Sequence, residues 1–166
     1  MKLPYRIATL CFLFDRNGQT LLIHRHKSPN HDLYSPIGGK LEQDDGESPT
    51  GCAAREIFEE AGLTVSVDDL HLTGIVSEKG YEGQGHWLLF CYELMIPCNV
   101  EAKQISEGRL EWVPLENVLD LPIPDSDRQV IWPLFLEYRH GFFAAHIDCT
   151  GPDLQWSLEQ SVLPPQ

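Results

Sequence analysis

Three glutamates in one short segment are the side chains of this sequence best suited to chemistry. Glu59 and Glu60 follow Glu56 at distances of three and four residues, and Arg55 stands directly before them. In a helix such side chains share a face, where like charges repel by roughly a few tenths of a kcal/mol per pair. A divalent cation would relieve this repulsion, and carboxylate oxygens are ligands that Mg²⁺ or Mn²⁺ prefers. The spacing therefore predicts a metal site on this segment.

A glycine turn and a helix must position these glutamates. The double glycine at residues 38–39 allows the backbone to turn tightly and to expose carbonyl oxygens to a ligand. Ser48 followed by Pro49 is typical of a helix start, and Gly62 is typical of a helix end. These signals predict a helix over residues 49–61.

The predicted helix has an apolar face and an acidic face. At about 100° per residue, the three glutamates lie opposite a narrow apolar stripe that is expected to pack on a sheet. A solvated acidic face is the ordinary interpretation of such a helix. The glycine turn before it and Arg55 within it favour a ligand site instead. The residues of the apolar stripe are Ala54, Ile57, Phe58 and Ala61.

The stretch from Gly38 to Leu63 resembles the Nudix box, the signature of hydrolases that act on nucleoside diphosphates linked to another group. In its usual form a Gly is followed after five residues by Glu, and after seven more by Arg-Glu-aliphatic-any-Glu-Glu-any-Gly-aliphatic. Glu47 and the run 55–63 match this form fully, whereas Gly39 and Glu47 are separated by seven residues. The extra length falls in the loop 43–46, where added residues cost little closure entropy. We interpret it as an accommodated insertion.

The resemblance implies a site for a divalent metal, Mg²⁺ or Mn²⁺. The three helix glutamates would bind the ion, the Gly38 carbonyl would join them, and Glu47 would be a supporting ligand. Arg55 would orient the glutamates. The metal ligands that the resemblance implies are therefore Gly38, Glu47, Glu56, Glu59 and Glu60.

The same resemblance implies hydrolysis of a phosphoanhydride bond. Metal ions that bridge phosphate oxygens neutralise charge in the transition state and lower the pKa of a bound water. A nearby carboxylate can take the proton of that water. Glu59 or Glu60 is the expected base, and Glu107 in a later loop is the next candidate. Glu107 is equally well explained as an ordinary exposed loop residue.

The candidates for substrate binding come from several segments. Arg25 lies in the basic run 24–27, which is either a solvated strand end or a site for phosphate oxygens. Asp127 or Asp125 can accept hydrogen bonds from purine N–H groups, but Asp caps a helix just as readily. Tyr81 lies 18 residues beyond the box, a spacing that resembles relatives cleaving diadenosine polyphosphates. The residues predicted to bind substrate are Arg25, Lys40, Tyr81, Asp125 and Asp127.

Three aromatic side chains near loops bear on the substrate as well. Tyr34, Tyr81 and Trp87 either stack on a base or belong to the core, where aromatic residues in strands are usually found. The expected activity is that of a MutT-like hydrolase, which converts a purine nucleoside triphosphate, its base oxidised or not, to the monophosphate and pyrophosphate. A diadenosine polyphosphate or ADP-ribose-type substrate is the first alternative. The second is a module that senses a nucleotide without cleaving it, although every acid of the box is present.

The pattern of apolar runs and turn signals predicts one α+β domain over residues 1–166. The resemblance implies an α/β/α sandwich, in which helices cover a central mixed sheet. A second helix is expected from Asp125 or Ser126, with a kink or a break near Ile131 caused by Pro133. Besides the box at 38–63, strands are expected over 7–14, 20–24, 65–67, 70–77, 86–96 and 109–113, and a C-terminal hairpin over about 142–160.

The overall composition limits the partners of this chain. A formal net charge of -13 argues against broad contact with nucleic-acid polymers or anionic membranes. No apolar run approaches the roughly 20 residues of a membrane helix. Five cysteines without CxxC spacing indicate buried free thiols in a reducing compartment. We therefore expect a cytoplasmic protein that binds a small nucleotide, as a monomer or a homodimer.

Overall fold

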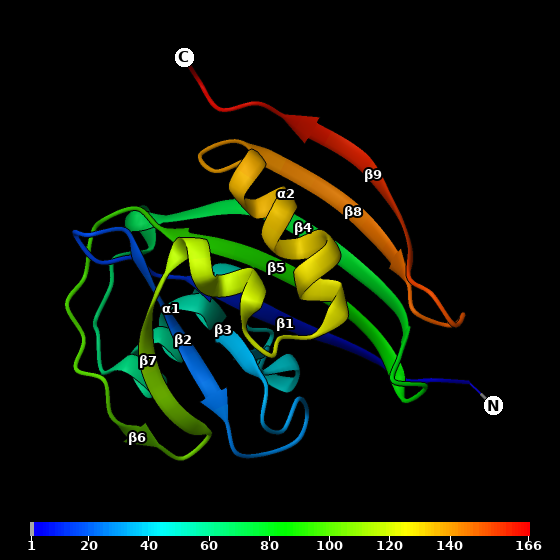
Figure 1. Cartoon of the computed structure of the whole chain (residues 1–166), viewed down its shortest axis with the longest axis horizontal. Helices are drawn as coiled ribbons and strands as arrows, with labels where there is room; N and C mark the ends of the chain where they lie inside the picture. Colours follow the sequence, from blue (N-terminus) through cyan, green and yellow to red (C-terminus); the bar gives the residue numbers. More distant parts are fainter. Residues whose placement is uncertain (1) are drawn as a thin grey trace.

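A mixed β-sheet runs through the centre of the molecule (Figure 1). The computed structural model describes residues 2–166. The strands are β1 (Tyr5–Phe12), β2 (Gln19–Arg25), β3 (Tyr34–Lys40), β4 (Leu70–Tyr81), β5 (Gly85–Leu94), β6 (Gln104–Ile105), β7 (Gly108–Pro114), β8 (Phe142–Asp148) and β9 (Gln155–Val162). Within these residues they are hydrogen-bonded in the order β6-β7-β2-β3-β1-β5-β4-β8-β9. The β1–β5 and β4–β8 pairs are parallel and the β1–β3 pair is antiparallel, so the predicted mixed sheet is confirmed.

Strand β3 joins two parts of this sheet. Its first residues pair with β2, where Pro36 lies opposite Leu22, and its last residues pair with β1, where Ile37 lies opposite Cys11. The change of partner occurs directly before the double glycine at residues 38–39. The two parts of the sheet therefore separate at the start of the box, which leaves room beside it.

Helices cover both faces of the sheet, as the sequence predicts. Figure 1 shows α2 (Trp132–Glu137) in front of the sheet and α1 (Pro49–Ala61) behind it. Ile57 of α1 belongs to the same apolar cluster as Cys11 of β1. The next residue of β1, Phe12, points to the opposite face and stacks on Phe135, with ring centroids 3.9 Å apart. This α+β sandwich buries one core on each side of the sheet.

The ends of α1 are confirmed at the predicted residues. The Ser48 side chain accepts a hydrogen bond from the Gly51 N–H at 3.0 Å, which caps the first turn. Gly62 ends the helix with a φ of 70°, a conformation that glycine adopts without strain. The helix therefore starts and stops where its capping residues require.

The buried face of α1 differs from the predicted stripe. Phe58 is 57% exposed, whereas Glu60 is only 4% exposed and Cys52 is fully buried. The reason is a polar contact, because Glu60 accepts a hydrogen bond from the Gly38 N–H and turns that side of the helix towards β3. Helical periodicity placed Ile57 and Ala61 correctly but could not reveal this contact.

The predicted second helix starts at Asp125, and a π-helical turn interrupts it up to Ile131 without breaking it. Residues Asp127–Ile131 form a π-helical turn, and Pro133 stands at the start of α2. The C-terminal hairpin is also observed, formed by β8 and β9, with its second strand reaching Val162.

Three short segments refine the sequence-based assignment. Residues 65–67 do not form a strand; Val67–Asp69 make a 3₁₀ turn instead, because the Ser66 side chain accepts the Asp68 N–H at 3.2 Å. Strand β4 continues to Tyr81, four residues beyond the end of the predicted strand 70–77. The loop insertion of the box forms a 3₁₀ turn over Gln43–Asp45.

The cysteines and helices complete the description of the fold. Cys11, Cys52, Cys91 and Cys98 are buried free thiols, as predicted, and Cys149 is a half-buried one. Across residues 2–166, no helix is both long enough and apolar enough to cross a membrane.

Candidate active site

Arg55 connects the carboxylates of the box to one another. Its Nε lies 2.7 Å from Glu47 Oε2 and its Nη2 lies 2.9 Å from Glu47 Oε1. Its Nη1 donates to Glu56 Oε1 at 3.0 Å and to Glu59 Oε2 at 3.2 Å. The hydrogen bonds from Arg55 lower the pKa of Glu47 to about 2. Arg55 therefore holds Glu47, Glu56 and Glu59 in fixed positions.

Glu60, the last glutamate of the box, is buried, and only one of its two carboxylate oxygens has a hydrogen-bond partner in the described residues. Its Oε1 accepts the Gly38 N–H at 2.9 Å. Its Oε2 is buried and has no hydrogen-bond partner within residues 2–166. Burial raises the pKa of Glu60 to about 8, with the neighbouring Glu56 and Glu107 charges acting in the same direction. A cation beside Glu60 would remove this cost, because it would favour the ionised carboxylate.

The double glycine is required by close contacts. A Cβ atom on Gly39 would overlap the Glu56 carboxylate, and one on Gly38 would overlap the Thr9 carbonyl oxygen. Glycine at both positions therefore lets β3 approach β1 and α1 closely enough to bring Glu56 and Glu60 against the backbone.

These residues fit a divalent metal by their chemistry. The donors are hard oxygens, the Oε2 atom of Glu60 lacks a partner, and the glycines leave space beside Glu56. In the described part of the chain, however, no three acidic, His or Cys side chains are already arranged around one point. The physical reason is Arg55, whose ion pairs with Glu56 and Glu59 hold these carboxylates away from a shared centre.

A cavity of about 340 Å³ opens beside the box. It extends from the double glycine to the turn that precedes α2. The predicted site residues that line it are Arg25, Gly38, Lys40, Glu56, Glu60, Tyr81, Glu107 and Asp127. Glu59 is not brought into its wall, since its side chain is 53% exposed and paired with Arg55. Glu47 and Arg55 belong to the ion-pair network described above.

Asp127 and Asp125 prove to be very different side chains. Asp127 is 8% exposed, lines the cavity, and burial raises its pKa to about 8. It is the first residue of the π-helical turn, and the residue in the cap position is Ser126. Asp125 is exposed and forms an ion pair with Arg128 at 3.3 Å. The structure therefore brings Asp127 to the cavity and leaves Asp125 outside it.

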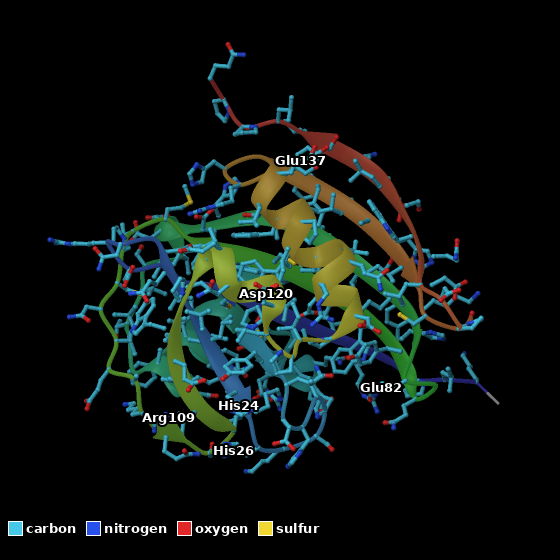
Figure 2. The ribbon with its side chains drawn as sticks, viewed as in Figure 1. His24, His26, Glu82, Arg109, Asp120 and Glu137 are labelled. Atoms are coloured by element: carbon cyan, nitrogen blue, oxygen red, sulfur yellow. The ribbon has the colours of Figure 1, made fainter. Side chains whose placement is uncertain are left out.

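The basic run at the end of β2 lies at the mouth of the cavity. Arg25 lines the cavity, and its Nε donates to the Pro29 carbonyl oxygen at 2.7 Å. Figure 2 shows His24, His26 and Arg109 gathered at the ends of β2 and β7, where His24 lies opposite Arg109. Of this group, Arg25 lines the cavity and brings a positive charge next to the box.

Tyr81 closes one side of the cavity. Its hydroxyl donates to Asn30 Oδ1 at 2.7 Å, which links the end of β4 to the loop after β2. Trp87 of β5 also lines the cavity, whereas Tyr34 stacks on His24 with ring centroids 4.5 Å apart. Of the three aromatic candidates, Tyr81 and Trp87 are thus available to a ligand in the cavity.

Sequence reasoning missed one ionisable residue of the cavity wall, Glu78. It lies in β4, is 4% exposed, and faces the cavity. A signal was present in the sequence, because Val76, Glu78 and Gly80 occupy alternate, inward-facing positions of one strand. An acid at such a position is unusual, because Glu is rarely buried, and it therefore indicates a candidate site residue.

Comparison with known proteins places this geometry beside solved structures. The model of the NUDIX domain matches residues 4–132, which include the box and Asp127. The crystal structure of a MutT protein from Bacillus halodurans is 30% identical, with a TM-score of 0.74, and the match covers 93% of this chain and 97% of that one.

Two curated relatives show how far the similarity extends along the chain. An RNA pyrophosphohydrolase from Bartonella bacilliformis is 28% identical over 162 residues, covering 83% of this chain and 94% of that protein. Diphosphoinositol polyphosphate phosphohydrolase 3-beta from Bos taurus is 41% identical over 58 residues, covering 35% of this chain and 33% of that protein. The chain thus spans about a third of the length of this diphosphoinositol polyphosphate phosphohydrolase.

Proposed function

This chain belongs to the Nudix hydrolase family, and we propose that it converts a purine nucleoside triphosphate, its base oxidised or not, to the nucleoside monophosphate and pyrophosphate. The observation that carries the proposal is the cavity that joins the box carboxylates Glu56 and Glu60 to the buried Asp127. Its volume of about 340 Å³ suits a small molecule, for which sites span roughly 300–1,000 Å³. One end thus offers groups for phosphates and the other offers a group for a base.

The box is proposed to hold Mg²⁺ or Mn²⁺ near the phosphates. Glu56 and Glu60 line the cavity and would bind the ion, and the carbonyl of Gly38 is proposed to join them. Glu59 would take part after its carboxylate leaves Arg55. When bound, the metal supplies charge neutralisation at the phosphate oxygens and activation of the attacking water.

Cationic side chains at the mouth are proposed to receive the phosphate oxygens. Arg25 lines the cavity and is fixed by its hydrogen bond to Pro29, so its planar guanidinium is held in place for a ligand. Lys40 lines the same cavity from the end of β3. Arg25 would orient the triphosphate, while Lys40 would add a mobile positive charge.

Two glutamates are the proposed candidates for the proton acceptor. Glu60 and Glu107 both line the cavity, whereas Glu59 is exposed and bound to Arg55. Glu107 is not part of the box helix, and its Oε2 accepts the Ser106 hydroxyl at 2.8 Å. If a glutamate acts as the base but does not bind the metal, its replacement by Gln should lower turnover without lowering metal affinity. Comparison of Glu107→Gln with Glu60→Gln therefore separates the two roles.

The inner end of the cavity is proposed to bind the base. Asp127 would accept hydrogen bonds from purine N–H groups, and Trp87 provides an aromatic surface in the same wall. The Tyr81 ring lines this wall while its hydroxyl is engaged by Asn30. The proposed site thus gives a planar base apolar surfaces and one polar contact.

Hydrolysis of a nucleotide panel tests this proposal. The panel contains dGTP, 8-oxo-dGTP, dATP, dCTP, ADP-ribose and diadenosine tetraphosphate, each with and without Mg²⁺. We expect the highest kcat/KM with a purine triphosphate and Mg²⁺, with monophosphate and pyrophosphate as the products by chromatography. Faster cleavage of ADP-ribose or the dinucleotide would replace this proposal with the corresponding alternative.

A second candidate substrate is the 5′-triphosphate end of an RNA. The similarity to an RNA pyrophosphohydrolase over 83% of this chain and the cationic Arg25 in the cavity wall favour it. The net charge of -13 opposes it, because a polymer brings further phosphates to an acidic surface. A short 5′-triphosphorylated RNA added to the panel decides between the two: a kcat/KM above that of every mononucleotide would favour the RNA.

A further inference from the structure

Two carboxyl groups meet at the inner end of the cavity. Glu78 from β4 is 4% exposed and Asp127 from the turn before α2 is 8% exposed, and both line the cavity. We call these two residues the acid pair. Asp127 belongs to the proposed base site, whereas Glu78 is not part of it.

The cations nearest to the acid pair in sequence have other partners. Lys79 points to the opposite side of β4 and binds Asp148 Oδ2 at 3.1 Å. Arg128 binds Asp125 and donates to the Leu121 carbonyl oxygen at 2.7 Å. Among the ion pairs of residues 2–166, none includes a member of the acid pair. The protein therefore keeps two buried carboxyl groups beside a cavity, and neither forms an ion pair within residues 2–166.

The acid pair combines a hydrogen-bond acceptor with a donor. Burial raises the pKa of Glu78 to about 7. Burial, followed by the nearby Glu78 charge, raises the pKa of Asp127 to about 8. Near neutral pH the two groups together therefore hold at least about one proton. A carboxylate accepts on both oxygens, while a carboxylic acid also donates through its O–H.

We infer that Glu78 is a specificity-determining residue, which acts with Asp127 to select a base whose edge carries a carbonyl beside two adjacent N–H donors. Guanine-type purines have this edge. This inference rests on the proposed function, because it names the base of the proposed substrate. The ionised member of the acid pair would accept both N–H groups, and the protonated member would donate to the carbonyl oxygen.

Other bases fit the acid pair less completely. The adenine edge offers one amino group beside a ring nitrogen. The protonated member could bind these two atoms, but the ionised member would then keep an oxygen without a donor in a buried site, which is unfavourable. Hypoxanthine keeps the carbonyl and the ring N–H but lacks the amino group. Oxidation of guanine at C8 leaves the same edge in place. The acid pair therefore predicts discrimination among purines but not between dGTP and 8-oxo-dGTP.

Steady-state hydrolysis by isosteric variants tests the inference. Glu78→Gln keeps the size of the side chain but fixes its donor and acceptor atoms. We expect the wild-type protein to favour dGTP over dATP and dITP, and the variant to lower the dGTP:dATP ratio of kcat/KM at least about tenfold. Glu82→Gln is the matched control, since Glu82 is exposed in the turn beyond the same strand (Figure 2). Its ratio should equal that of the wild-type protein.

Binding of monophosphates separates this inference from the proposed function. The affinities for dGMP and dAMP are measured by calorimetry, which needs no turnover. If no triphosphate is hydrolysed but dGMP binds better than dAMP in a Glu78-dependent way, the proposed function fails and the base selection stands. If triphosphates are hydrolysed but Glu78→Gln keeps the wild-type ratios in both assays, the inference is overturned.

A second substitution protects the test against a folding defect. Glu78→Asp keeps the acid but withdraws it by one methylene group, so it should lose base preference as Glu78→Gln does. Circular dichroism identifies whichever variant is folded. A folded Glu78→Asp protein with the wild-type dGTP:dATP ratio would equally overturn the inference.

Discussion

Arg55 binds both carboxylate oxygens of Glu47, with Nε 2.7 Å from Oε2 and Nη2 2.9 Å from Oε1. The same guanidinium donates to the Lys40 carbonyl oxygen at 3.1 Å. Because Lys40 and Glu47 stand on either side of the lengthened loop 43–46, Arg55 fixes both of its ends. The helix glutamates therefore keep their positions although the box carries an insertion.

The first prediction concerns Arg55 itself. Arg55→Lys keeps the charge but cannot bind Glu47 through two parallel N–H groups. Because residues that orient metal ligands typically contribute 10- to 100-fold, we expect kcat/KM to fall by about that factor. Steady-state hydrolysis with saturating Mg²⁺ measures it, with Arg16→Lys at an exposed turn as control. Activity within twofold of the wild-type protein would contradict the role assigned to Arg55.

The second prediction concerns the loop insertion. Deletion of Asp44 and Asp45 restores the usual spacing of the box and removes part of a 3₁₀ turn without buried residues. Since the change in loop-closure entropy is below about 1 kcal/mol, the fold and the Mg²⁺ dependence should persist. Chemical denaturation and the Mg²⁺ concentration for half-maximal activity check this. Loss of metal dependence after deletion would show that the insertion is part of the site.

The sequence predicted the box helix because its signals are local. Ser48, Pro49 and Gly62 define the ends of α1, and their effects depend on neighbouring residues only. The burial of Glu60 could not be predicted in this way, because it depends on the Gly38 N–H, 22 residues earlier in the chain. Helical periodicity therefore gave the correct helix with an incorrect boundary between its buried and exposed faces.

Base-site residues illustrate the same limit. Asp127 was found as a candidate, but its burial follows from the π-helical turn that precedes Pro133. Glu78 was missed because the predicted strand ended at residue 77, and only the fold shows that β4 continues through Glu78 and borders a cavity there. Long-range packing, not local propensity, decides where these two carboxyl groups meet.

The third prediction is a decrease of stability with rising pH caused by the acid pair. Folded pKa values of about 7 for Glu78 and about 8 for Asp127 exceed the ordinary values of 4.5 and 3.8. Above about pH 4 the unfolded chain releases protons that the folded protein retains, so the free energy of unfolding falls until about pH 8. Each group contributes at most about 1.4 kcal/mol per pH unit.

Urea unfolding of the metal-free protein between pH 5 and 8 measures this slope. The double variant Glu78→Gln, Asp127→Asn should show a smaller decrease over the same range, because neither replacement titrates. Equal slopes for the two proteins would mean that the acid pair does not bind its protons as described. Since Glu82 is exposed, Glu82→Gln should keep the wild-type slope.

The fourth prediction concerns a buried ion pair away from the cavity. Arg139 binds the Oε1 atom of Glu93, which is 2% exposed, and its guanidinium lies 4.1 Å from the centroid of the Phe14 ring. Arg139→Met leaves a buried carboxylate without its partner, so we expect a loss of about 3–5 kcal/mol in the free energy of unfolding. Chemical denaturation measures the loss.

Two further variants make this test specific. Lys79→Met breaks the more exposed pair with Asp148 and should cost less than about 1 kcal/mol. Adding Glu93→Gln to Arg139→Met removes the unpaired charge and should recover part of the lost stability. If Arg139→Met destabilises no more than Lys79→Met, the Glu93 pair is not a buried interaction in solution.

The central claim is that the box carboxylates make this chain a metal-dependent hydrolase of purine nucleoside triphosphates. Glu60 is the most direct probe, because it is buried, faces the cavity and has a buried oxygen without a partner in the described residues. The decisive measurement is pyrophosphate release from dGTP with Mg²⁺ by the wild-type protein and by folded Glu60→Gln. We expect turnover by the wild-type protein and a decrease of at least about 100-fold in the rate of pyrophosphate release by the variant. Wild-type turnover by Glu60→Gln, or no purine triphosphate hydrolysis by the wild-type protein, would contradict it.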